Sequence, residues 1–128
     1  MKPEAVRFIE QANIMLDRAR IMLTVNLNED AARAAYLACF HAAQAYIFER
    51  SDRTAKTHQG VQSEFFRLSH VDSRVDQELR RFLSRSYEFK SIADYFSGSD
   101  PAVLPDEAAD SVDTARRFVD HIGGLVEP

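Results

Sequence analysis

The fold of this chain is decided by the stretch RAAYLACFHAAQAYIFER, residues 33–50. Alanine and aromatic side chains recur in it at steps of three and four, which is the spacing of one face of an α-helix. Alanine favours the helical backbone, and its small side chain lets a second helix approach closely. The stretch therefore predicts a helix from Asn28 to about Glu49 whose apolar face packs against a neighbouring helix. The side chains expected on that face are Ala32, Ala35, Tyr36, Cys39, Phe40, Ala43, Tyr46 and Ile47.

The same periodicity extends over the rest of the chain, and no segment shows the alternation typical of a β-strand. Asn28 and Thr57 are expected to cap the second and third helices, because both side chains accept hydrogen bonds from a first helical turn. Five helices with short connections predict an all-α, antiparallel up-and-down bundle. A length of 128 residues suits a single domain over residues 1–128. Besides the second helix, the expected helices cover residues 3–25, residues 57–68, a segment from a cap at Asp72 or Ser73 to Phe96, and a segment from Pro105 to a stop at Gly123 and Gly124.

The bulk composition argues against several classes of protein. A net charge of −4 is unusual for a protein that mainly coats phosphate backbones. The single cysteine, Cys39, allows neither an internal disulfide nor a cysteine zinc cluster, and we expect it in the core. The N-terminal residues lack an apolar signal region, and no run approaches the ~18 apolar residues of a membrane span. We expect a cytoplasmic protein without membrane association and without a metal or other cofactor.

Two histidines, His41 and His58, are candidate functional residues because aromatic and basic residues flank them. Neither forms the repeated helical Glu-x-x-His pattern of a di-metal bundle site, so no metal site is expected. For both, a structural role is the alternative. Lys56 precedes the start of the third helix, where free backbone N–H groups and a positive side chain suit an anion. The alternative at this position is simply a helix start capped by Thr57.

Basic residues also recur along the fourth helix. Arg74, Arg81 and Arg85 follow one another at spacings of seven and four, which places them on one helix face. Such a stripe could contact phosphates. The alternative is a solvated face on which the arginines pair with Glu78 and Glu88.

Three motifs in this order resemble the HEPN domain family, named for higher eukaryotes and prokaryotes nucleotide-binding: residues 33–50, AKTHQGV at residues 55–61, and LSRSYEFKSIADY at residues 83–95. The chain is most similar to the small, single-domain prokaryotic branch, over about residues 5–120. The resemblance implies a helical bundle that is often a homodimer. Small members are often encoded beside a minimal nucleotidyltransferase, as toxin–antitoxin or nucleotide-handling pairs. Many members are metal-independent ribonucleases.

The ribonuclease motif of the family is an arginine followed after four to six residues by a histidine, and the resemblance places it at the end of the fourth helix. Here Lys90 and Tyr95 stand at those positions. Lysine lacks the planar fork that grips a phosphate, and tyrosine, with a reference pKa of ~10, is a poor general base at neutral pH. A structural helix end, with Lys90 paired to Asp94, is therefore one interpretation.

The function expected from these features is a HEPN binding or regulatory module with a degenerate nuclease motif, rather than an enzyme. The alternative is a metal-independent ribonuclease in which Lys90 holds phosphate and Tyr95 or His41 transfers protons. A plain helical scaffold that forms a homodimer is a third interpretation. The residues expected to contact a nucleotide or RNA are Lys56, His58, Arg85, Lys90, Asp94 and Tyr95.

Overall fold

The computed structural model describes residues 2–95 and 103–126, except the side chains of residue 89 and residues 92–95. Its regular elements are five helices, and the described residues contain no strand. The all-α bundle expected from the sequence is thereby confirmed. None of the described helices is long and apolar enough to cross a membrane. The helices are α1 (Pro3–Thr24), α2 (Asn28–Ser51), α3 (His58–Ser69), α4 (Gln77–Tyr95) and α5 (Pro105–Val126).

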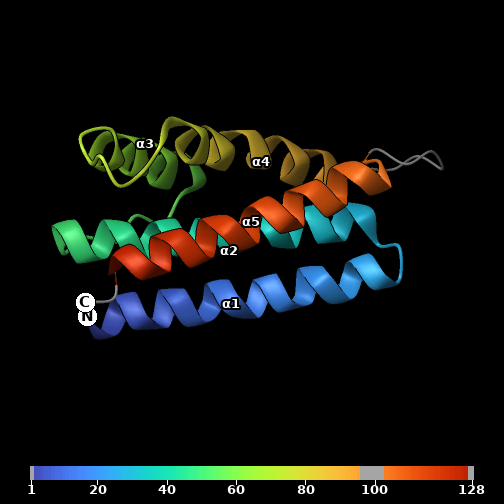
Figure 1. Ribbon diagram of the computed structural model, residues 1–128, viewed down its shortest axis with the longest axis horizontal. Coiled ribbons are helices and arrows are strands. Elements are labelled where there is room, and N and C mark those ends of the chain that lie inside the picture. The colour runs from blue at the N-terminus through green and yellow to red at the C-terminus, as the bar shows by residue number, and fades with distance from the viewer. Residues whose placement is uncertain (1, 96–102, 127–128) are drawn as a thin grey trace.

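The helices are arranged in layers around α2 (Figure 1). Helix α1 lies on one side, α2 and α5 run side by side in the middle, and α3 and α4 lie on the other side. Helices α1 and α2 are antiparallel neighbours, as their short connection predicts (Figure 1). Within the described residues, α2 packs against all four other helices. Any side chain that α2 directs toward α3 and α4 therefore comes from the centre of the bundle.

The core is built on the alanine-rich face of α2. Ala35, Ala38, Ala42 and Ala45 have no exposed surface, so the neighbouring helices come close to the α2 backbone. Larger side chains fill the space on either side of this stripe. The bulkiest fully buried ones are Tyr36, Tyr46, Phe65 and Phe118.

Two of the three expected N-caps differ from the structure. Thr57 does cap α3, because its Oγ1 accepts a hydrogen bond of 2.9 Å from the Gly60 amide. Asn28, in contrast, is already the first residue of α2, and the cap position is held by Leu27 without a side-chain hydrogen bond. The cap expected at Asp72 or Ser73 is also wrong: α4 begins at Gln77.

Asp76 takes the capping role on α4, since its Oδ1 accepts a hydrogen bond of 2.8 Å from the Leu79 amide. Asp72 is instead drawn into a network with α2. Its carboxylate accepts a hydrogen bond of 2.7 Å from the Tyr46 hydroxyl and two from the Arg74 guanidinium, at 2.9 and 2.8 Å. Arg50 adds a contact of 3.2 Å. The turn between α3 and α4 is thereby fixed to α2.

The end expected for the last helix at Gly123 and Gly124 is also wrong, because α5 continues to Val126. No described glycine has a positive φ, so neither residue forms the left-handed turn that ends many helices. Gly123 is buried, and a Cβ placed on it would lie 3.9 Å from Cδ1 of Ile9. Gly123 thus lies inside α5 where the helix faces α1, and the helix continues through it without a break.

Candidate functional site

His58 lies at the centre of a group of aromatic rings where α2, α3 and α4 meet. Its ring centroid lies 5.5 Å from that of Tyr36, 5.1 Å from that of Phe40 and 5.2 Å from that of Tyr87. Tyr36 and Phe40 belong to α2 and are buried, whereas His58 and Tyr87 are half-buried. These four residues are called the His58 cluster below. The two buried rings support the two that reach the surface.

A hydrogen bond between Tyr36 and His58 determines which nitrogen of the imidazole carries the proton. The Tyr36 hydroxyl lies 2.8 Å from Nδ1 of His58. Burial raises the pKa of this hydroxyl above its ordinary value, and a hydrogen bond from the Gln62 side chain partly opposes the rise. A buried hydroxyl that keeps its proton can donate it to Nδ1, and neutral His58 then carries its own proton on Nε2.

His41 lies beside the same cluster in the opposite tautomer. Its ring meets Phe40 edge-on, with the centroids 5.5 Å apart. Nδ1 of His41 lies 2.8 Å from Oε1 of Gln44, whose amide nitrogen donates to the Ala55 carbonyl at 2.9 Å. Because Oε1 can only accept, Nδ1 of His41 donates the proton. In neutral His41 the other nitrogen, Nε2, is therefore an acceptor.

Lys56, Arg85 and Lys90 are the lysines and arginines expected at the site, and the structure brings Lys90 to the His58 cluster. The Lys90 ammonium lies 5.6 Å from the centroid of the Tyr87 ring. Lys56 is exposed at the start of α3, two residues before His58. Arg85 lies elsewhere on α4, with its guanidinium 5.8 Å from the Phe82 ring.

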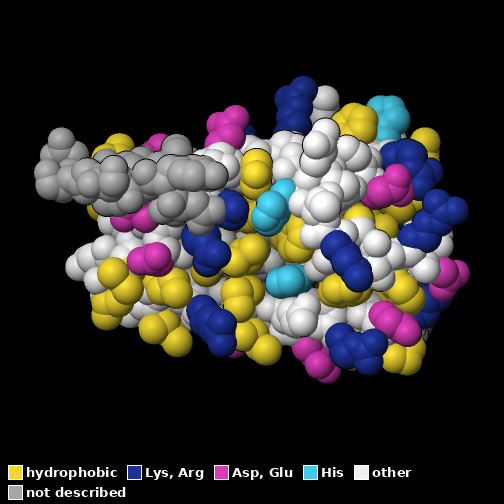
Figure 2. Space-filling model, turned by 180° about the vertical axis from the view of Figure 1, so that it is seen from behind, with side chains coloured by type: hydrophobic (Ala, Val, Ile, Leu, Met, Phe, Trp, Pro, Cys, Tyr) yellow, Lys and Arg dark blue, Asp and Glu magenta, His cyan; other side chains and the backbone are white. Residues whose placement is uncertain are grey.

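The remaining expected site residues, Asp94 and Tyr95, fall in the last turn of α4, and their side chains lie outside the described residues. The sequence interpretation missed Tyr87, Gln44 and Gln62, which hold His41 and His58 in place. The only local signal was the four-residue spacing of Tyr36, Phe40 and Gln44 on α2. Figure 2 shows a face of the molecule on which histidine side chains lie among hydrophobic and basic side chains.

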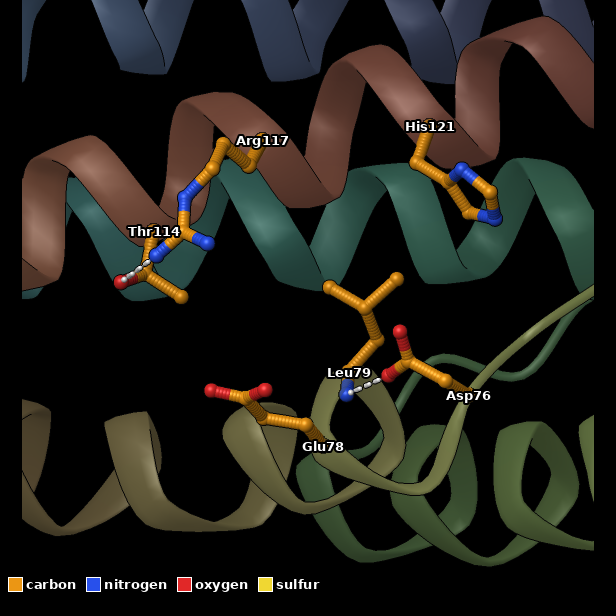
Figure 3. A pocket seen from close by; sticks show the side chains of 6 residues that line it. All are labelled: Asp76, Glu78, Leu79, Thr114, Arg117 and His121. Atoms are coloured by element: carbon orange, nitrogen blue, oxygen red, sulfur yellow. Dashed lines mark hydrogen bonds between the residues drawn. The ribbon is translucent and has the colours of Figure 1, made fainter.

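A separate pocket of about 220 Å³ lies between the start of α4 and α5 (Figure 3). Thr114, Arg117 and His121 line it from α5. Its other wall carries Leu79 and the two carboxylates of Asp76 and Glu78, so the charges of this pocket do not favour a phosphate. His121 is itself hydrogen-bonded through Nε2 to the Arg74 carbonyl. The His58 cluster is therefore the better candidate site.

No group of three or more His, Cys, Asp or Glu side chains among the described residues is arranged to hold a metal ion. Lys90 and His41 lie beside the four rings of the His58 cluster. Aromatic rings can stack on a nucleobase, the lysine can pair with a phosphate, and the two imidazoles can donate and accept protons.

Comparisons with known proteins agree with this fold. The HEPN domain model matches residues 5–125. Among solved structures, the chain is similar to the crystal structure of TT1696 from Thermus thermophilus, with 20% sequence identity and a TM-score of 0.78. The similarity covers 96% of this chain and 98% of that chain, and at this identity it shows the shared fold. A search of curated proteins finds no match.

Proposed function

The chain belongs to the HEPN domain family, and we propose that it is a single-domain, cytoplasmic binding or regulatory module for a nucleotide or RNA. Membership supports a nucleotide- or RNA-related role. The observation that carries the finer proposal is the position of His58 among three aromatic rings, with the Lys90 ammonium over one of them. Half-buried rings offer stacking surface to a base, and a lysine beside them offers charge to its phosphate.

Lys90 is the residue on which a binding test depends most directly. We expect Lys90→Ala to weaken binding of fluorescently labelled AMP and of a short single-stranded RNA several-fold, measured by fluorescence anisotropy. Arg18→Ala on α1 is the matched control, because it removes one exposed positive charge far along the chain from the cluster. Equal affinity of Lys90→Ala and the wild type for both ligands would count against the proposal.

We also propose that the module forms a homodimer and works with a minimal nucleotidyltransferase partner, in a toxin–antitoxin-type or nucleotide-handling pair. The support is the family resemblance, together with Lys90 and Tyr95 in place of the arginine and histidine of the nuclease motif. Purification of the tagged chain from its native cell should recover a nucleotidyltransferase, and light scattering should give twice the mass of 14.6 kDa. Recovery of the chain alone, as a monomer, would contradict both parts.

A second candidate function is metal-independent RNA cleavage, and one observation favours it. His41 and His58 flank Phe40 in opposite tautomers, so one imidazole can accept a proton while the other donates one. The test is a cleavage time course of RNA in EDTA with His41→Asn, Lys90→Ala and Tyr95→Ala variants. Cleavage that these changes abolish would support the enzyme. Cleavage that none of them changes would come from a contaminant.

A further inference from the structure

We propose that the groove between α3 and α4 binds a single strand of nucleic acid that extends beyond one nucleotide. This inference rests on the proposed function, because the strand would reach the His58 cluster at one end of the groove. The groove consists of two adjoining pockets that share Phe66 of α3 and Ser84 of α4. Their volumes are about 360 and 390 Å³. One is also lined by Arg80, Arg81, Arg85 and Glu88, the other by Gln62 and Ser63.

Phe66 supplies a stacking surface in this groove. Its side chain is 56% exposed, although α3 buries its other large aromatic residue, Phe65, almost completely. One face of the Phe66 ring is supported by His70, with the centroids 5.4 Å apart and the planes at 21°. An exposed, supported aromatic ring is the surface on which an unpaired base stacks. A duplex offers no unpaired base, so the feature favours a single strand.

Two arginines of the groove differ from their neighbours in their charge environment. Arg67 pairs with Glu64 at 2.7 Å, and Arg74 pairs with Asp72 at 2.8 Å. For Arg81 and Arg85, in contrast, no carboxylate of the described residues lies within ion-pair distance. Glu88 is the one acidic residue among the described residues of the lining. Arg81 and Arg85 are exposed, as the solvated face considered from the sequence expects, but the pairs with Glu78 and Glu88 are not among the ion pairs of the described residues.

Arg80 has a different role from Arg81 and Arg85. Its Nη1 donates to the carbonyls of Ser69 at 3.2 Å and Val75 at 2.6 Å, which fixes the turn that closes one end of the groove. Arg81 and Arg85 are one turn apart on α4. Two arginines in this position can contact successive phosphates of a strand.

The groove leads to the His58 cluster. Gln62 lines its second pocket and is close enough to the Tyr36 hydroxyl to lower its pKa, and this hydroxyl is hydrogen-bonded to His58. On α4, Ser84 of the groove and Tyr87 of the His58 cluster are three residues apart, which places them next to each other on one helix face. A mononucleotide would occupy the cluster alone, whereas an oligonucleotide would occupy both surfaces.

The test compares labelled single-stranded RNA of two and eight nucleotides, single-stranded DNA of eight nucleotides, and labelled AMP. We expect the eight-nucleotide strand to bind at least about tenfold more tightly than AMP. Phe66→Ala should weaken its binding at least about fivefold, and Phe66→Trp should restore it. Arg81→Ala should weaken binding and reduce the slope of affinity against salt by about one. Arg67→Ala is the control, because Arg67 lies on α3 but lines neither pocket.

The outcomes separate this inference from the proposed function. Suppose that Lys90→Ala weakens AMP binding but the longer strand binds no more tightly than AMP. This result would contradict the strand site in the groove and leave the proposed function supported. No binding of any ligand would overturn both. Equal affinity for a polyglutamate peptide would also contradict a nucleic-acid site in the groove, because negative charge alone would then explain the binding. The ratio of RNA to DNA affinity identifies which strand the groove prefers.

Discussion

The hydroxyl of Tyr36 lies 2.8 Å from Nδ1 of His58, although 22 residues separate them in the chain. The bond joins a fully buried position on α2 to a half-buried imidazole at the start of α3. It fixes both the ring orientation of His58 and the nitrogen that carries its proton. The bundle core thereby sets the chemistry that His58 presents to a ligand.

Tyr36→Phe keeps the aromatic ring and removes only the hydroxyl. We expect the free energy of unfolding to fall by about 1 kcal/mol, because one hydrogen bond is lost and Gln62 loses its acceptor. The readout specific to His58 is nitrogen NMR of its imidazole at a pH where it is neutral. The wild type should be protonated on Nε2 alone, and the variant should show a mixture of tautomers. An unchanged spectrum would contradict the positioning role of Tyr36.

The relation between Tyr36 and His58 also marks the limit of what the sequence could predict. Apolar periodicity predicted five helices, and the local Thr57 cap was found because its donor, the Gly60 amide, is three residues away. The placement of His41 and His58 around Phe40 depends on how α3 lies across α2. That packing is a tertiary property without a local pattern.

The boundaries that were wrong have the same cause. Aspartate is a common helix cap. The Asp72 carboxylate instead accepts hydrogen bonds from the side chains of Tyr46, Arg50 and Arg74. Gly123 resembles a helix stop, but it is buried within α5 opposite Ile9 of α1, and the helix continues past it. In both cases a contact between distant segments overrides the local signal.

Asp72→Asn tests this network through the pH dependence of stability. Hydrogen bonds from Arg74, and then from Tyr46, hold the pKa of the carboxyl well below its usual range, against the opposing effect of burial. The folded-state pKa lies below the unfolded value of about 3.9, so ionised Asp72 stabilises the fold above about pH 4. This contribution is lost as the pH falls through the folded pKa.

We therefore expect Asp72→Asn to lower the free energy of unfolding by about 2 kcal/mol at pH 7, measured by urea denaturation. The difference from the wild type should be smaller at pH 3. Asp17→Asn is the control, since its carboxylate is exposed on α1 and lies 3.5 Å from Arg20. A difference that is constant between pH 7 and pH 3 would show that the carboxylate charge does not matter.

Cys39 provides a probe of the core that needs no mutation. Its side chain has no exposed surface, and burial raises the pKa of the thiol above its ordinary value. The reactive thiolate is therefore both rare and inaccessible in the folded protein. Labelling by a thiol reagent should be slow in native buffer and should accelerate in urea across the unfolding transition. Complete labelling within minutes in native buffer would contradict the packing of α2.

The most direct test of the central claim, that the His58 cluster binds a nucleotide, is an NMR titration of the histidine side chains with AMP. The four histidines report on different parts of the molecule in one experiment. The signals of His41 and His58 should shift together and give one dissociation constant, while that of His121, near the separate pocket on α5, should stay unchanged. Shifts at His121 alone, or no shift at any histidine up to millimolar AMP, would contradict the claim.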